Sequence, residues 1–539
     1  MAGKNDDANN GAAHANAGPN ADSSGNPQPA VGTGLPESDP TEKPFTPETL
    51  DRTVIAIPLL DEIKKNPDKI QNIIIDLNLE YPGGRDKARE TIYEWIDDLS
   101  MKDKQNQGAN RAKSKYSQQY IFGRLSGRNI QILVERDLAA RAGGKGALAL
   151  YRIWLDFEVT RFTNKSISTV KADAARNAFG ALGRDIVWAV VDTGIDGTHP
   201  HFERHKNLVL DAPLQHRDFT GLGDASDEVL ATQACADVAG HGTHVAGIIA
   251  GRIESSPARP LAAAVRNRSA EGAVERTTIT LPEMSGMAPE CKLLSLKVLN
   301  DKGAGLASNL IAAIEYIQEL NGNGRRLRVH GVNMSVGYDF EPRWFACGQS
   351  PLCVEVDRLV RTGVVVVVAA GNTGYGVLQT QARGAVLAGM DLTINDPGNA
   401  ELAITVGATH RDSPHIYGVS YFSSKGPTGD GRLKPDLVAP GEKILSCRSA
   451  QSAPDPAPFA PGDDGPPPGA ALYKEDSGTS MAAPHVSGVI AAFLSVRREF
   501  IGQSLAVKDI FLSTATDLKR AVYFQGKGLV DLMRAIQSV

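Results

Sequence analysis

Cysteine is scarce in this chain: five of its 539 residues are cysteine, and that number is odd. An odd count does not fit a framework of paired disulfides, so we expect reduced thiols, with a local Cys347–Cys353 disulfide as the alternative. The formal net charge is only −5, which gives no reason to expect nucleic acid as a partner. No apolar run approaches the ~20 residues of a membrane-spanning helix, so no membrane span is expected.

The first 45 residues are almost free of aliphatic and aromatic side chains and are rich in Asn, Ala, Gly, Asp and Pro. Such a segment cannot bury enough apolar surface to offset the entropy lost on ordering, so the sequence predicts a disordered tail over residues 1–45. The tail lacks a basic start followed by an apolar core, which is the pattern of a secretory signal peptide. A cytoplasmic location is therefore expected.

Three short segments together predict one reactive site. A weak serine nucleophile needs a histidine to take its proton, and a carboxylate fixes the tautomer of that histidine. Asp192 follows an apolar, strand-like run, whereas His241 and Ser480 each open an apolar run of helix-like composition. A nucleophile at the start of a helix also gains from the unpaired N–H groups there. The segments are residues 190–196, 241–247 and 478–484.

Each of these residues has an ordinary structural explanation when it is taken alone. An aspartate after a strand is commonly a turn or cap residue, and Ser480 alone would serve as a helix N-cap. The joint occurrence of acid, base and nucleophile in the order Asp, His, Ser favours the catalytic interpretation. His244 forms a His-x-x-His pair with His241, but no nearby Cys or His completes a metal-binding set. We expect a packed structural histidine there and assign no metal ligand.

These motifs, in this order along the chain, resemble those of the subtilisin-like serine proteases, the subtilases. The resemblance implies a serine endopeptidase in which Ser480 attacks the peptide carbonyl, His241 carries the proton and Asp192 orients His241. A run of five valines followed by Ala-Ala-Gly-Asn is a further match. It implies that the side chain of Asn372 and the backbone N–H of Ser480 hold the oxyanion.

The resemblance also assigns two segments to the substrate, which is a protein or peptide. One forms a wall of the pocket for the residue before the scissile bond. The other pairs with the substrate as an added strand, where small residues let another backbone approach closely. Ordinary turn glycines are the alternative for both segments. The assigned residues are Ser335, Val336, Gly337, Gly303, Ala304 and Gly305.

Two patterns of secondary structure divide the rest of the chain. From residue 166 to 539, strand-like and helix-like segments alternate, which predicts an α/β fold with a doubly wound, mostly parallel sheet. Residues 50–165 follow the order β-α-β-β-α-β, a ferredoxin-like α+β arrangement. Two of its expected strands cover residues 119–125 and 130–134, around a turn at 126–129.

Subtilase propeptides share this small arrangement and precede the peptidase domain. The resemblance therefore implies that residues 50–165 act as an intramolecular inhibitor of the domain that follows. The protein would then be a self-inhibited precursor that cuts itself, and we expect the cleaved bond in an exposed stretch within residues 157–167. An accessory domain that happens to precede the protease is the alternative.

Three segments depart from a minimal subtilase, and one of them is the short insertion bracketed by Cys347 and Cys353. Residues 252–285 form a long segment after the predicted His241 helix, and it has no cluster of Asp or Asn ligands. This argues against a calcium site, and no cofactor is expected to be required. Residues 450–470, which are rich in Pro and Gly, are either a flap beside the site or an inert surface loop.

Three other functions compete with a self-activating protease. A binding protein that keeps a protease fold usually loses a member of the triad, and none is lost here. A secreted degradative protease would need an export signal, which the sequence pattern does not predict. An enzyme dedicated to maturing one partner protein also fits the unusual tail and insertions.

Overall fold

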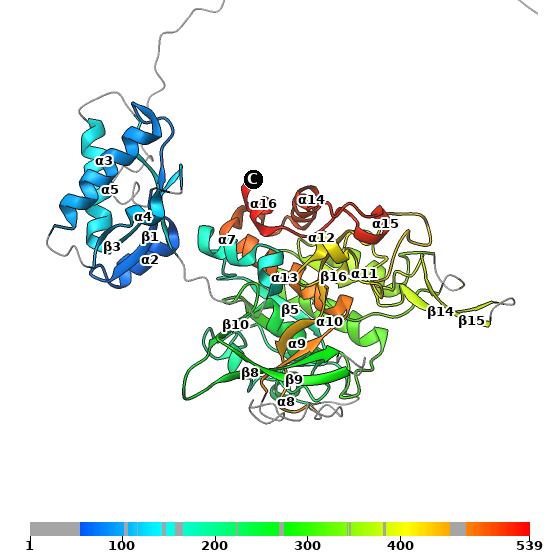
Figure 1. Cartoon of the computed structure of the whole chain (residues 1–539). Coiled ribbons are helices and arrows are strands. Elements are labelled where there is room, and N and C mark those ends of the chain that lie inside the picture. Colours follow the sequence, from blue (N-terminus) through cyan, green and yellow to red (C-terminus); the bar gives the residue numbers. More distant parts are fainter. Residues whose placement is uncertain are drawn as a thin grey trace, which may run out of the picture. The chain divides into compact units, whose positions relative to one another are not determined.

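The computed structural model describes two folded parts of the chain, and each is considered by itself (Figure 1). The predicted tail, residues 157–164 of the expected cleavage zone and residues 453–470 of the Pro- and Gly-rich segment lie outside the described residues. The described residues are 54–101, 106–115, 117–142, 147–156, 165–221, 225–268, 274–341, 343, 346–380, 384–452 and 471–539.

The N-terminal part, blue to cyan in Figure 1, is a four-stranded sheet with helices. Its elements are α2 (Ile57–Lys65), β1 (Ile70–Leu77), α3 (Gly84–Leu99), β2 (Gly108–Ala109), α4 (Arg111–Ser114), β3 (Tyr120–Ser126), α5 (Gly127–Ala142) and β4 (Leu150–Leu155). The strand order is β2-β3-β1-β4, and β1 runs antiparallel to both β3 and β4. Burial alternates along β1, so Ile73 and Ile75 enter the core, where Ile92 and Ile96 of α3 are also fully buried.

The expected strand over residues 130–134 is wrong, because these residues lie inside helix α5. Ile130, Leu133 and Val134 are all buried, and their spacing is that of one helix face rather than of a strand. The helix begins at Gly127, where an added Cβ would lie 2.9 Å from the carbonyl oxygen of Pro67. The missing strand is β2, which lies earlier in the chain and is too short for periodicity to reveal.

The C-terminal part contains a seven-stranded sheet in which every strand pair is parallel. Its strands are β5 (Val187–Asp192), β6 (Arg217–Asp218), β11 (Lys292–Lys297), β12 (Gly331–Met334), β13 (Val365–Ala369), β16 (Ile404–His410) and β17 (Leu437–Glu442). The strand order is β17-β16-β13-β12-β5-β11-β6. The order reverses direction along the chain, which confirms the predicted doubly wound sheet.

Helices cover both faces of this sheet. Helices α9 (His241–Ile249) and α13 (Thr479–Val496) pack on one face, and α10 (Ala307–Leu320) and α11 (Pro351–Arg361) pack on the other. Strand β5 serves both cores, since Val190 belongs to the first and Val191 to the second. A strand that is buried on both faces reads as a continuous apolar run, which is why the sequence revealed it.

A second sheet of four strands, in the order β18-β19-β8-β9, lies outside the parallel sheet. Its strands are β8 (Leu261–Arg268), β9 (Val274–Leu281), β18 (Ile444–Cys447) and β19 (Tyr473–Asp476). The long segment 252–285 thus contributes the β8–β9 hairpin. The alternating pattern placed the run at 443–446 in the parallel sheet; it forms part of β18 and pairs antiparallel with β19 instead.

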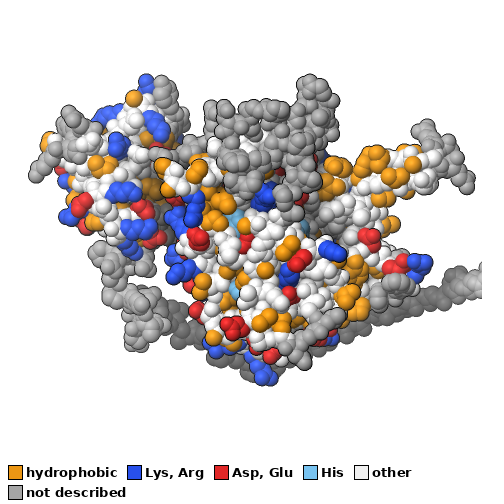
Figure 2. Space-filling model, turned by 90° about the horizontal axis from the view of Figure 1, so that it is seen from below, with side chains coloured by type: hydrophobic (Ala, Val, Ile, Leu, Met, Phe, Trp, Pro, Cys, Tyr) orange, Lys and Arg blue, Asp and Glu red, His pale blue; other side chains and the backbone are white. Residues whose placement is uncertain are grey.

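A separate hairpin of β14 (Tyr375–Thr380) and β15 (Gly384–Gly389) projects from the domain at the right of Figure 1. Val377 and Leu387 face each other across its strands and are 60% and 63% exposed. Orange side chains gather on the same projection in Figure 2.

The remaining elements are α6 (Lys165–Thr169), α7 (Ala172–Phe179), α8 (Asp227–Ala234), β7 (Arg252–Glu254), β10 (Glu283–Ser285), α12 (Pro414–Tyr417), α14 (Ser504–Thr514), α15 (Val522–Gln525) and α16 (Leu532–Gln537).

Helix α13 is the one helix in the described residues whose length and composition would allow it to cross a membrane, and 83% of that stretch is buried inside the domain. The sequence pattern did not single it out as a span.

All five cysteines carry free thiols, so the alternative of a Cys347–Cys353 disulfide is not found.

Candidate active site

Asp192 and His241 come together where strand β5 ends and helix α9 begins. The Asp192 side chain is 1% exposed, and its Oδ1 atom lies 2.7 Å from Nδ1 of His241. The same oxygen accepts a hydrogen bond from the backbone N–H of Thr193 at 2.8 Å. Burial by itself lowers the pKa of His241, but the charge of Asp192 and its hydrogen bond outweigh burial and raise the pKa above 6.5. The pair is thus a carboxylate-oriented imidazole.

Ser480 is the second residue of helix α13 and lines the same cavity as His241, which has a volume of about 750 Å³. Its hydroxyl donates a hydrogen bond to the backbone oxygen of Ser335 at 2.9 Å, and Ser335 Oγ donates to the backbone oxygen of Ser480 at 2.8 Å. The Ser480 hydroxyl is therefore hydrogen-bonded to the backbone of Ser335, in the cavity that His241 also lines.

The amide of Asn372 is oriented by the first residue of the same helix. Its Oδ1 atom accepts hydrogen bonds from the backbone N–H of Thr479 at 2.8 Å and from the Thr479 hydroxyl at 3.0 Å. The carbonyl end of the amide is thereby fixed, and Asn372 lines the same cavity as Ser480. An amide nitrogen held in this way is suited to bind a developing oxyanion.

All six residues assigned to the substrate lie in the walls of this cavity together with His241 and Ser480. Two of the glycines have no room for a side chain. A Cβ on Gly305 would lie 2.4 Å from the backbone oxygen of Val298, and one on Gly337 would lie 2.6 Å from that of Asp396. The close packing explains why small residues line these walls.

A model of the subtilase family matches residues 183–528, which is more than half of the chain. The chain belongs to the subtilase family. Subtilases are serine endopeptidases.

Several characterised proteins are similar to this subtilase. Serine protease AprX of Bacillus subtilis (strain 168) is 29% identical over 352 residues, which cover 64% of this chain and 64% of AprX. Subtilisin E of the same organism is 29% identical over 371 residues, covering 69% of this chain and 70% of the relative. Pyrolysin of Pyrococcus furiosus is 31% identical over 340 residues, which are 55% of this chain and 21% of pyrolysin. The matched region thus spans under two thirds of AprX.

The cavity of this subtilase also contains residues that sequence reasoning missed. Tyr338 and Asn395 both line it, although they are far apart in the chain. They are brought together because the backbones of Tyr338 and Asp396 exchange two hydrogen bonds of 2.9 and 3.0 Å. Asn395 lies against Thr373, whose hydroxyl is 3.3 Å from Asn395 Oδ1. Neither residue lies in a motif that the sequence analysis assigned to the site.

His244 is not among the residues that line the cavity of the subtilase site. It is fully buried, its Nε2 atom lies 3.2 Å from the backbone oxygen of Lys474, and burial lowers its pKa to about 4. In the described ranges of the chain, no group of three or more His, Cys, Asp or Glu side chains is arranged to hold a metal ion.

Proposed function

We propose that this subtilase hydrolyses peptide bonds with Asp192, His241 and Ser480 as its triad. The observation that carries the proposal is the 2.7 Å contact between Asp192 and His241, in a cavity that His241 shares with Ser480 at the start of α13. Asp192 fixes the tautomer of His241 so that Nε2 is the free acceptor, because Nδ1 donates to the carboxylate. His241 is then the general base.

Catalysis begins when the Ser480 hydroxyl turns from the Ser335 oxygen to Nε2 of His241. Its oxygen attacks the peptide carbonyl while His241 takes the proton, and the charge of the imidazolium is balanced by Asp192. Asn372 Nδ2 and the backbone N–H of Ser480 donate to the oxyanion, and the first turn of α13 favours negative charge there. His241 returns the proton to the leaving amine, and water repeats the sequence on the acyl-serine.

The substrate is a protein or peptide bound in extended form. We propose that the segment Gly303 to Gly305 pairs with the backbone before the scissile bond as an added strand. The segment Ser335 to Gly337 lines the pocket for the residue whose carbonyl is attacked. The tight packing behind Gly305 and Gly337 keeps both backbones close to the cavity.

We further propose that residues 50–165 are a ferredoxin-like propeptide that inhibits the peptidase domain until it is cut off. The proposal is supported by the order β1-α3-β2-β3-α5-β4, to which the N-terminal part adds α2 at its start and the four-residue α4 between β2 and β3, and by the strand order β2-β3-β1-β4. Its place directly before the peptidase domain supports the same role. The cut would fall within residues 157–167 and would be made by Ser480 itself.

Intact mass over time tests both proposals on the purified chain and on Ser480→Ala. We expect the wild type to lose about the first 160 residues, because the cut is expected in an exposed stretch within residues 157–167. The variant should keep its full mass. A small alkyl fluorophosphonate should label the wild type once and leave Ser480→Ala unlabelled. Labelling without cleavage would reject self-processing and keep the triad, whereas equal cleavage of both chains would assign the cut to another protease.

A further inference from the structure

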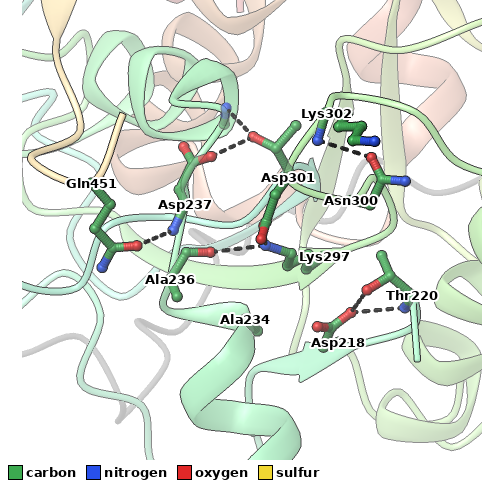
Figure 3. A network of polar contacts seen from close by, with 12 residues as sticks. Asp218, Thr220, Ala234, Ala236, Asp237, Lys297, Asn300, Asp301, Lys302 and Gln451 are labelled. Carbon is green, nitrogen blue, oxygen red and sulfur yellow. Dashed lines mark hydrogen bonds and ion pairs between the residues drawn. The ribbon is translucent and has the colours of Figure 1, made fainter. Parts of the chain in front are cut away.

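Lys297, the last residue of strand β11, carries a buried ammonium group that the triad chemistry does not use. Its side chain is 7% exposed. Nζ donates a hydrogen bond to Asp301 Oδ1 at 2.9 Å and another to the backbone oxygen of Ala236 at 3.3 Å, as Figure 3 shows. An apolar side chain of similar length would fill this space without the cost of removing a charge from water. The role of the Lys297 ammonium group is therefore indicated by the two groups that it contacts, Asp301 and Ala236.

One partner of Lys297, Asp301, belongs to the loop that ends in the substrate segment Gly303 to Gly305. This loop is internally braced by Asn300, whose Oδ1 accepts hydrogen bonds from the backbone N–H groups of Lys302 and Ala304 at 3.0 and 3.1 Å. The Asn300 N–H also donates to the backbone oxygen of Ala304 at 2.8 Å. Because the loop is one braced unit, holding Asp301 holds the segment that follows it.

The other partner, Ala236, lies in the loop that leads to the catalytic histidine. The next residue, Asp237, is fully buried, and its carboxylate accepts hydrogen bonds from the N–H of Gly240 at 2.7 Å and of Thr243 at 2.8 Å. These bonds fix the start of helix α9, which begins with His241. Lys297 thus joins the substrate loop to a segment that is itself anchored beside the base (Figure 3).

We propose that Lys297 is a positioning residue for the substrate: its ammonium group holds residues 300–305 against the cavity so that they can pair with an extended peptide. The inference rests on the proposed peptidase function and adds the residue that sets the binding segment in place. It predicts that Lys297 matters for substrates that extend several residues before the scissile bond. Reagents that reach Ser480 without occupying that segment should not depend on it.

The test compares Lys297→Met and Asp301→Asn with the wild type in two assays. One measures kcat and KM for a succinyl-Ala-Ala-Pro-Phe p-nitroanilide, which extends along the substrate segment. The other measures the rate at which a small alkyl fluorophosphonate labels Ser480. For Lys297→Met we expect a fall of about tenfold in kcat/KM for the peptide, carried mainly by KM and of the size expected for losing a hydrogen bond to a charged group. The labelling rate should be unchanged.

Lys292→Met is the matched control, because Lys292 begins the same strand and its Nζ donates to the backbone oxygen of Lys206 at 2.7 Å, away from the cavity. It should leave both assays unchanged. Asp301→Asn keeps a neutral acceptor on a side chain that is 58% exposed, so it should fold normally and show a smaller rise in KM.

Two results would overturn the inference. Equal losses of peptide hydrolysis and of labelling in Lys297→Met would mean that the lysine acts on the triad, since it is the register neighbour of Asp192 across β11 and β5. An unchanged KM in both variants would mean that the contact to Asp301 does not place the loop. A processed wild type that is not labelled at all would instead reject the proposed peptidase function.

Discussion

At the scale of single residues, the site combines a buried acid with a base that is only partly covered. The His241 side chain is 31% exposed, whereas that of Asp192 is 1% exposed. The nearby carboxylate therefore interacts strongly with the imidazole. The imidazole is at the same time exposed to the cavity in which the substrate is proposed to bind. Asp476 and Asp237 add smaller contributions of the same sign to the pKa of His241.

The pH dependence of hydrolysis should reflect these charges. His241 must be neutral to take a proton, so kcat/KM should rise with pH through a pKa above 6.5. In Asp476→Asn, one negative charge that raises this pKa is lost. We expect the acid limb of the kcat/KM profile to move to lower pH, as measured with the peptide p-nitroanilide.

Asp185→Asn serves as the control for that shift. Asp185 is an exposed carboxylate paired with Arg498, and it lies before the start of β5, whereas Asp192 ends that strand. Its removal should leave the acid limb in place. An acid limb that moves to higher pH in Asp476→Asn would contradict the stated charge effect on His241.

The residues of the site differ in how far the sequence revealed them. Asp192, His241 and Ser480 lie in three short motifs whose residue types fit together as acid, base and nucleophile, so the sequence alone predicts their roles. Asn395 had no such context, since it enters the cavity through a backbone bridge between residues 338 and 396. A contact made by two distant loops leaves no periodic pattern to detect.

At the scale of elements, strands buried on both faces were the most predictable. Strand β13 is buried at every position, and its valine run indicated this directly. Helix α5 was harder, because a short apolar stretch fits a strand and a helix face equally well. The segment 443–446 was predicted to be a strand, but not the sheet to which it belongs. It joins the second sheet because it pairs with β19, which is distant in the sequence, and local sequence does not specify that partner.

Strands β5 and β12 can pair closely because β12 has a glycine where β5 has a tryptophan. Gly331 is the register partner of Trp188, and a Cβ at Gly331 would lie 2.2 Å from the indole ring. Trp188 is fully buried and cannot move aside. We expect Gly331→Ala to destabilise the domain by about 1–3 kcal/mol, the usual cost of overpacking a core, and to lower its melting temperature.

Thermal unfolding of Gly221→Ala provides the comparison, since a Cβ at Gly221 meets nothing within 4 Å. That variant should melt close to the wild type. If Gly331→Ala melted at the wild-type temperature, β5 and β12 would have to accommodate the added Cβ without loss of stability. That result would contradict the prediction.

At the scale of the whole molecule, the chain carries a small α+β part and a large α/β part, each with its own buried core. A domain with its own core can be destabilised without touching the catalytic residues. If the small part inhibits the large one, its stability should set how readily the unprocessed chain becomes reactive.

Ile75→Ala tests this link, because Ile75 is fully buried in the small part and its truncation should cost about 2–5 kcal/mol. We expect the fluorophosphonate to label the unprocessed variant faster than the unprocessed wild type, with mass spectrometry separating processed from unprocessed chains. Ile132→Ala is the control, since Ile132 is 38% exposed in the same part. Equal labelling rates for all three chains would argue against an inhibitory role.

The two hydrogen bonds between Thr479 and Asn372 have a consequence for thermal motion. Thr479 precedes Ser480 on the same helix, and its hydroxyl also accepts a hydrogen bond from the N–H of Gly371 at 3.1 Å. Vibration of the helix therefore carries the attacking oxygen and the amide of Asn372 in the same direction. The distance between the Ser480 oxygen and the Asn372 amide therefore varies less than the position of either group. The two groups stay aligned with each other even when the helix as a whole is displaced.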